Sequence, residues 1–213
     1  MKKKVLPVIV AILLILVIGG CALGKVLLDK YSYSKEEADW NEFYQVSEDD
    51  RSAIILQNEM VEEQALIKDG VCYFDLATVH KYMNEVFYAD MAENLLLYAT
   101  PTEVIRTTFG ETAYTTTEGT QEAGYVISFA DGDNVYVAAD YVKLFTNYSY
   151  ECYDSHVQVN TEWGIRQVAQ LKKDTAVRLR GGVKSPILTQ AVKGDTLEIL
   201  EQMETWSKVK TAD

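Results

Sequence analysis

Short apolar runs separated by turn residues make up most of the chain after residue 53. Within these runs hydrophobic and polar side chains alternate, as in strands that bury one face. The runs lie at residues 53–57, 65–67, 71–74, 95–99, 104–109, 124–129, 135–138 and 156–160. Turn residues at 68–70 and 131–134 predict hairpins, because Gly, Asn and Asp tolerate positive φ. Only Leu76–Val86 and Ala139–Phe145 have helical spacing, so the pattern predicts a mainly β (α+β) fold with two short helices.

The amino-terminal pattern is different, because residues 5–24 contain no charged side chain. As a helix, this stretch is about 30 Å long, which matches the hydrocarbon core of a bilayer. Lysines at positions 2–4 precede it, so the positive-inside rule predicts a cytoplasmic amino terminus. The sequence therefore predicts a transmembrane helix within a membrane anchor over residues 1–28. The chain would be a single-pass protein of the cell membrane with its bulk extracytoplasmic.

Three fates fit this apolar run. A retained signal anchor explains its full length and the apolar residues that follow at 26–28. A lipoprotein signal also fits, because Ile18-Gly19-Gly20-Cys21 is typical of a lipobox in which Cys21 carries the lipid. Cleavage near Ala22 is the third possibility.

Residues 29–52 are polar and acidic and are expected to form a spacer. Within them, Ser34-Lys35-Glu36-Glu37 has the composition of a capping box ahead of a short helix through Tyr44.

The two predicted helices belong to an internal repeat. Residues 71–79 align with residues 134–142, and each copy is a strand with a central Tyr followed by an amphipathic helix. A hairpin follows in both copies, near Asp90 in the first and Asp154 in the second. A helix this short must bury its apolar stripe on a sheet, so the repeat predicts two strand–helix–hairpin units.

This repeat resembles the copper amine oxidase N-terminal-like domain, a bacterial surface module of strand–helix–hairpin repeats. The resemblance covers about residues 65–170, within a domain that we place at 53–170. It implies a binding or scaffolding role in the cell envelope. It implies no copper site here, because no His cluster is present to ligate copper.

Residues 171–213 form the most specific pattern. Val177-Arg178-Leu179-Arg180 precedes the turn Lys193-Gly194-Asp195 and an alternating run, after which Trp206-Ser207-Lys208-Val209 follows. This order resembles a bacterial SH3-like domain. Family members continue with Gly-x-x-Gly-aromatic-Val, the strand that closes the barrel. Since this chain ends at Asp213, the resemblance implies an incomplete barrel and a fragment or truncated product.

The order of anchor, spacer, repeat module and SH3-like domain is similar to the front of family 18 glycoside hydrolases of Gram-positive bacteria. There the catalytic barrel follows the SH3-like domain. This resemblance implies that any hydrolase chemistry would lie beyond residue 213.

Charge is distributed unevenly. Residues 65–165 contain 15 acidic and 4 basic side chains, whereas residues 166–213 contain 6 and 9. The acidic middle argues against a nucleic-acid partner, because phosphate binding needs clustered Lys and Arg. The basic end either favours an anionic wall polymer or is a solvated surface.

No catalytic, cofactor-binding or metal-binding residues are predicted. Family 18 chemistry needs a strand end with three Asp and a final Glu. Asp131-Gly132-Asp133-Asn134 lacks the third Asp and the Glu and is typical of a turn. Cys152 and His156 share a strand face without a third group to orient a base. Two isolated histidines, His80 and His156, do not form a metal-ligand pattern.

Cys72 and Cys152 lie in strand-like runs. Two interpretations stay open: a disulfide, which an oxidising compartment allows, or two unpaired thiols buried as small apolar residues.

Most tyrosines occupy alternating strand positions and are expected to pack in the sheet. Trp163 and Trp206 are the candidate ligand-contact aromatics. The sequence thus predicts a non-catalytic envelope module that is tethered to the membrane and binds cell-wall glycan or peptide. The alternative is the ancillary front of a family 18-type hydrolase acting on chitin-like or peptidoglycan-like polymers.

Overall fold

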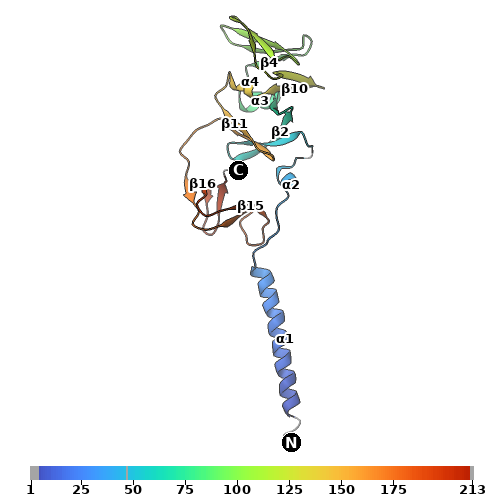
Figure 1. Cartoon of the computed structure of the whole chain (residues 1–213), viewed down its shortest axis with the longest axis vertical. Helices are drawn as coiled ribbons and strands as arrows, with labels where there is room; N and C mark the ends of the chain where they lie inside the picture. Colours follow the sequence, from blue (N-terminus) through green and yellow to red (C-terminus); the bar gives the residue numbers. More distant parts are fainter. Residues whose placement is uncertain (1–4, 47, 212–213) are drawn as a thin grey trace. The chain divides into compact units, whose positions relative to one another are not determined.

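The computed structural model describes residues 5–46 and 48–211, without the side chains of residues 5–9 and 11–12 (Figure 1). These residues are mainly β, with seventeen strands and four helices. The strands form sheets of seven, five, three and two members. The chain divides into two compact units: a central unit, Asp39–Gln167, and a terminal unit that combines Met1–Ala38 with Val168–Thr211. The second unit therefore joins segments from both ends of the sequence.

The seven-stranded sheet is the scaffold of the central unit. In sheet order its strands are β11 (Ser149–Cys152), β12 (His156–Asn160), β1 (Arg51–Leu56), β2 (Glu59–Lys68), β3 (Val71–Asp75), β10 (Asn134–Ala138) and β9 (Ser128–Asp131). The pair β1–β12 is parallel, and every other neighbouring pair in this sheet is antiparallel. The predicted turn between β2 and β3 is confirmed: Asp69 and Gly70 have φ values of 52° and 77°.

The second sheet of the central unit is an antiparallel meander. Its strands follow one another in the sequence: β4 (Phe87–Asp90), β5 (Leu95–Ala99), β6 (Val104–Thr108), β7 (Ala113–Thr116) and β8 (Gly119–Glu122). The strand predicted over 124–129 is wrong for most of its length, because β9 begins only at Ser128. Gly124, at φ 82°, turns the chain there, and the fully buried Ile127 accepts a hydrogen bond from the Ala138 amide of β10 just before β9 begins.

Both copies of the repeat have the order strand, helix, hairpin. The first runs β3, α3 (Leu76–Tyr82), β4 and β5, and the second runs β10, α4 (Ala139–Lys143), β11 and β12. The two repeat strands pair with each other, with Phe74 opposite Val137. The two hairpins differ, since the first joins the five-stranded sheet and the second joins the seven-stranded sheet. The helices also start differently: Asp75 accepts a hydrogen bond from the Ala77 backbone in α3, whereas α4 has no side-chain cap.

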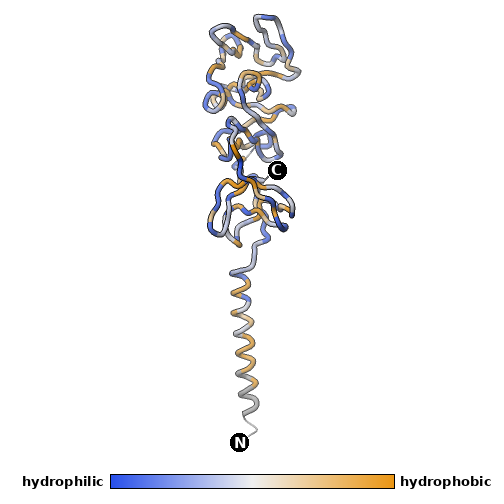
Figure 2. The backbone as a smooth tube through the Cα atoms, turned by 90° about the vertical axis from the view of Figure 1, so that its left-hand side faces the viewer, coloured by the Kyte–Doolittle hydropathy of each residue, from blue (hydrophilic) through white to orange (hydrophobic). Residues whose placement is uncertain are grey.

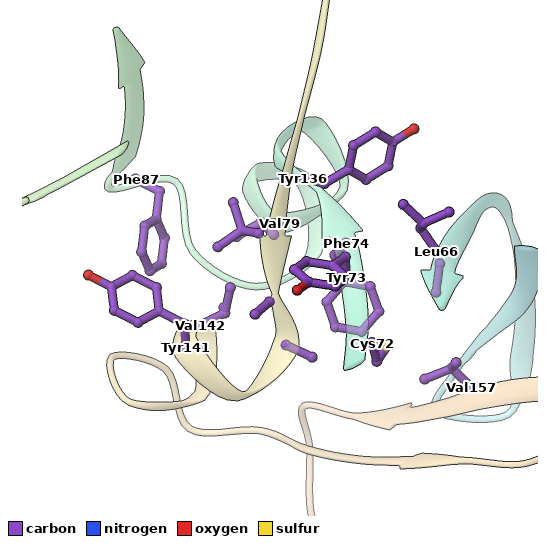
Figure 3. Close-up of a cluster of buried hydrophobic side chains, with 14 of the residues drawn as sticks. Leu66, Cys72, Tyr73, Phe74, Val79, Phe87, Tyr136, Tyr141, Val142 and Val157 are labelled. Carbon is purple, nitrogen blue, oxygen red and sulfur yellow. The ribbon is translucent and has the colours of Figure 1, made fainter. Parts of the chain in front are cut away.

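The core of the central unit lies where the repeat strands and helices meet. Figure 3 shows Phe74 of β3 beside Val79 of α3 and Val142 of α4. All three side chains are fully buried. Because each helix is too short to be stable alone, this burial is what holds α3 and α4 in place.

Tyrosine is a packing residue here, as the sequence predicts. Tyr73 and Tyr136 are 3% and 4% exposed, and Tyr141 stacks edge-on with Tyr114 at 5.3 Å between ring centroids. Burial raises the pKa of Tyr125 to about 12, with the Asp140 carboxylate adding to the effect. Burial likewise raises the pKa of Tyr141 above its ordinary value.

These raised pKa values predict alkaline unfolding. The folded state favours neutral tyrosine, and this preference stabilises it in full below pH about 10, the ordinary pKa of tyrosine. The stabilisation is lost as pH rises through the higher pKa of the folded state. We expect the free energy of unfolding to fall between pH about 10 and 12, measured by urea denaturation alongside tyrosinate absorbance. Tyr125→Phe should reduce this loss of stability at alkaline pH. The control Tyr88→Phe should leave it unchanged, because the Tyr88 side chain is 60% exposed. Stability that stays flat to pH about 12 would contradict the prediction.

The terminal unit contains helix α1 (Val5–Tyr31) and two small sheets. One sheet is β13 (Val168–Gln170), β16 (Thr196–Gln202) and β17 (Ser207–Lys210), and the other is the pair β14 (Thr175–Arg178) and β15 (Ile187–Ala191). The predicted turn at 193–195 is present: Gly194 has φ 101°, and the Val192 amide donates to an Asp195 side-chain oxygen at 2.8 Å.

The predicted membrane anchor is wrong. Among the residues that the structure describes, no helix is both apolar enough and long enough to cross a membrane. The transmembrane helix, the anchor over residues 1–28 and the single-pass location in the cell membrane are therefore not supported. The lysines at 2–4, on which the predicted orientation rested, lie outside the described residues.

The prediction rested only on the absence of charged side chains from residues 5–24. The helix also continues past the uncharged run, through Lys25 and Asp29. Figure 2 shows hydrophobic colours along the middle of α1 and hydrophilic colours near its carboxyl-terminal end.

The short helix predicted to end at Tyr44 is present as α2 (Trp40–Tyr44), but it begins later than the predicted cap. Asp39, not Ser34, caps α2: its side chain accepts hydrogen bonds from the Asn41 and Glu42 amides. The predicted capping box at 34–37 is therefore wrong. Its backbone is extended and pairs with β15, as described next.

Candidate peptide-binding edge of β15

Residues 32–38, which we call the strap, pair with Ile187, the first residue of β15, and with the loop that precedes it. The Ile187 amide donates to the Glu36 carbonyl, and the Ala38 amide donates to the Ile187 carbonyl, both at 2.8 Å. Glu37 and Ile187 thereby form a parallel bridge. Strap and β15 both belong to the terminal unit. Part of the segment predicted as a spacer therefore pairs with β15 through one β-bridge.

The loop between β14 and β15 extends this pairing. The Ser34 amide donates to the Val183 carbonyl at 2.7 Å, which continues the main-chain contacts beyond β15. Within the loop, a turn forms as the Ser185 amide donates to the Gly182 carbonyl at 3.1 Å. Lys184, inside this turn, reaches the Ser32 hydroxyl with its ammonium group at 3.1 Å.

Arg178, the last residue of β14, supplies the side-chain recognition. One guanidinium nitrogen donates to the Ser34 carbonyl at 2.9 Å and another donates to the Ser185 carbonyl at 2.5 Å. The guanidinium carbon also lies 5.4 Å from the ring centroid of Tyr33. The Arg178 guanidinium thus makes a charged hydrogen bond to Ser34 and a cation–π contact with Tyr33, which are adjacent residues of the strap.

This edge has the chemistry of a peptide-binding site. Main-chain hydrogen bonds to a strand edge give affinity without regard to sequence, and side-chain contacts add selectivity. Here the selective contacts are Arg178 with Tyr33 and Lys184 with Ser32. The strap itself occupies the edge, so the structure contains one example of what the edge accepts.

Trp206 supports the loop that contacts the strap. A Cβ atom on Gly181 would lie 3.1 Å from Cγ of Trp206, so the indole packs directly against the glycine backbone. The Trp206 carbonyl also accepts a hydrogen bond from the Met203 amide at 3.0 Å. Trp206 is half-buried and positions the loop, while its role as a ligand contact stays a prediction.

The other predicted site residues are Trp163 and Cys21. Trp163 belongs to the central unit, between β12 and β13, and its side chain is 57% exposed. Cys21 is exposed on α1, and its lipidation stays a prediction.

Cys152 and His156, considered from the sequence as sharing one strand face, lie in different strands, β11 and β12. The His156 ring is stacked between Tyr44, at 5.1 Å between centroids, and Tyr153, at 4.8 Å. Cys152 instead contacts Cys72. Among residues 5–46 and 48–211, no group of three or more His, Cys, Asp or Glu side chains could hold a metal ion.

Sequence reasoning missed the strap and the role of Arg178. A signal was present, because Tyr31-Ser32-Tyr33-Ser34 alternates aromatic and small polar residues with the period of a strand. The capping-box motif that begins at Ser34 competed with this signal and predicted a helix instead. Comparison of the chain with protein-family models, curated proteins and solved structures finds no match.

Proposed function

We propose that the chain is a non-catalytic binding module that takes an extended peptide segment along β15, of the kind present in cell-wall polymers. The observation that carries the proposal is the strap, which pairs with Ile187 through two main-chain hydrogen bonds and presents Tyr33 to Arg178. A segment of another chain with the same backbone geometry would find the same donors and acceptors.

Two further points support this function. The resemblance of residues 171–213 to bacterial SH3-like domains implies binding rather than catalysis. The excess of basic residues in 166–213 also suits a peptide with acidic side chains. The strap itself contains Glu36 and Glu37 beside its Tyr33. We therefore expect a ligand with an aromatic residue followed by polar or acidic residues.

A binding assay with a released strap tests the proposal. Ser34→Pro removes the amide that donates to Val183, so the strap should leave the edge and the edge should become available. We expect this full-length variant to bind the synthetic peptide 31–39, and peptidoglycan that retains its peptides, about tenfold more tightly than the unmodified chain. Lys35→Ala is the matched control, because the Lys35 side chain is exposed.

The assay also separates the alternatives. Binding to chitin oligosaccharides, but not to peptide, would replace a peptide ligand by a glycan. Release of reducing sugar by the purified chain would show an enzyme and overturn the proposal. Equal, weak peptide binding by the Ser34→Pro variant and the unmodified chain would remove β15 as the site.

A further inference from the structure

Two cysteines from non-neighbouring strands of the central sheet lie close together. Cys72 lies in β3 and is 4% exposed, whereas Cys152 is the last residue of the edge strand β11 and is exposed. Three strands, β12, β1 and β2, stand between β11 and β3 in the sheet order. The two cysteines are nevertheless in contact, and their thiols share a hydrogen bond.

The path of β1 and β2 explains how the strands meet. The β1–β2 register shifts between Ala53 and Ile55, and such a bulge increases the local bend and twist of a sheet. Strand β2 pairs with β1 from Glu59 to Leu66 but with β3 only from Leu66 to Lys68. The sheet therefore curves, and its inner face brings β11 toward β3.

A second contact shows that β3 and β11 face each other. Phe74 lies two residues after Cys72, and Tyr150 lies two residues before Cys152. The centroids of the two rings are 6.4 Å apart. Side chains two positions apart share one face of a strand. Cys152 is also directly opposite the fully buried Val157, which Figure 3 shows on the same side of the core cluster as Cys72.

The thiols are not equivalent. The hydrogen bond to Cys152, together with burial, raises the pKa of Cys72, whereas the same hydrogen bond lowers the pKa of Cys152. Cys152 is therefore the more acidic thiol of the pair and ionises before Cys72. Since the thiolate is the nucleophile and Cys152 is exposed, reaction with an external reagent begins at Cys152.

We propose that Cys72 and Cys152 are a redox pair that closes to a disulfide by exchange with a low-molecular-weight disulfide, RSSR. The Cys152 thiolate attacks one sulfur of RSSR, which forms a mixed disulfide and expels RS⁻. The Cys72 sulfur then attacks Sγ of Cys152, and the leaving RS⁻ takes the Cys72 proton as RSH. The two cysteines lose two electrons, and RSSR gains them as one RS⁻ and one RSH.

The disulfide would tie the first copy of the repeat to the second. It joins β3 to the edge strand β11, 80 positions further along the chain. A cross-link over a loop of this length restricts the unfolded chain and slows the opening of an edge strand. The central unit would thus have a reduced form with a releasable edge and an oxidised form with a locked edge.

Mass spectrometry of the full chain in a Cys21→Ser background tests this inference. After equilibration with oxidised and reduced glutathione, we expect an intact mass lower by two hydrogen atoms, no alkylated cysteine, and a cross-linked peptide containing Cys72 and Cys152. The thermal midpoint should rise by about 5–10 °C on oxidation, because the disulfide restricts the unfolded state.

Cys152→Ser is the matched variant, because the exposed position tolerates a polar side chain. In this variant neither the mass nor the thermal midpoint should change with oxidation. A stable glutathione adduct on Cys152, with Cys72 still available to alkylation after unfolding, would overturn the proposal. An intermolecular disulfide, or thiols that remain reduced at every glutathione ratio, would overturn it as well.

Discussion

Replacing Phe74 by alanine should lower the free energy of unfolding of the central unit by about 3–5 kcal/mol, the usual cost of removing a buried aromatic ring. Phe74 is fully buried and lies edge-on to Tyr148 and Tyr150, at 6.5 and 6.4 Å between ring centroids. Its strand also pairs with β10. The loss would therefore affect both copies of the repeat, and it would consume much of the stability of a unit this size.

Urea denaturation followed by circular dichroism measures this loss. Phe74→Leu should cost less than half as much, because a branched aliphatic side chain refills part of the cavity. Tyr88→Ala is the exposed aromatic control, with its side chain 60% exposed, and should change stability by less than about 0.5 kcal/mol. A Phe74→Ala loss below about 1 kcal/mol would mean that β3 is not the centre of this core.

Local patterns in the sequence were enough to predict the elements around Phe74. The strand pattern in 71–74 and the helical spacing from Leu76 predict a strand that passes directly into a helix, and both depend only on near neighbours. Positive φ at Asp69 and Gly70 likewise follows from residue type. In each of these cases the deciding interaction lies within a few residues of the element it defines.

Interactions between distant segments could not be predicted in the same way. Nothing local to Phe87 or Tyr150 distinguishes the two repeat hairpins, yet one joins the five-stranded sheet and the other pairs beside β1. The meeting of Cys72 with Cys152 depends on the bulge at Ala53 and on the curvature it gives the sheet. Sheet order is decided by tertiary packing, which single-sequence patterns do not contain.

In the candidate site, too, the sequence predicted the local element but not the contact between distant segments. The sequence singled out Arg178 as part of a first strand, and β14 does end at this residue. Its partners Tyr33 and Ser34 come from a segment about 145 residues away, and their contact with Arg178 is a property of the folded terminal unit. The local capping motif at Ser34 predicted a helix because the competing partner, Ile187, is remote.

Removing the Arg178 side chain should release the strap from β15. The substitution Arg178→Ala eliminates two charged hydrogen bonds to carbonyl oxygens and the contact with Tyr33. Hydrogen bonds from charged donors contribute about 1.5–3 kcal/mol, so strap release should become about 10–100-fold more favourable. The amides of Ser34, Ala38 and Ile187, which bond across this edge, should then exchange faster by a similar factor.

Hydrogen exchange of the full chain measures this effect. The measurement is specific to the strap because faster exchange is expected at the amides of Ser34, Ala38 and Ile187. Arg180→Ala is the matched control, because Arg180 is exposed and only two positions away. Arg178→Lys should lie between the two, since lysine keeps the charge but not the fork that reaches Ser34 and Ser185 together. Strand β16 should keep its protection in all three variants, because its partners are β13 and β17. Faster exchange throughout β16 would show general unfolding of the terminal unit, and unchanged exchange at Ile187 would show that Arg178 does not hold the strap.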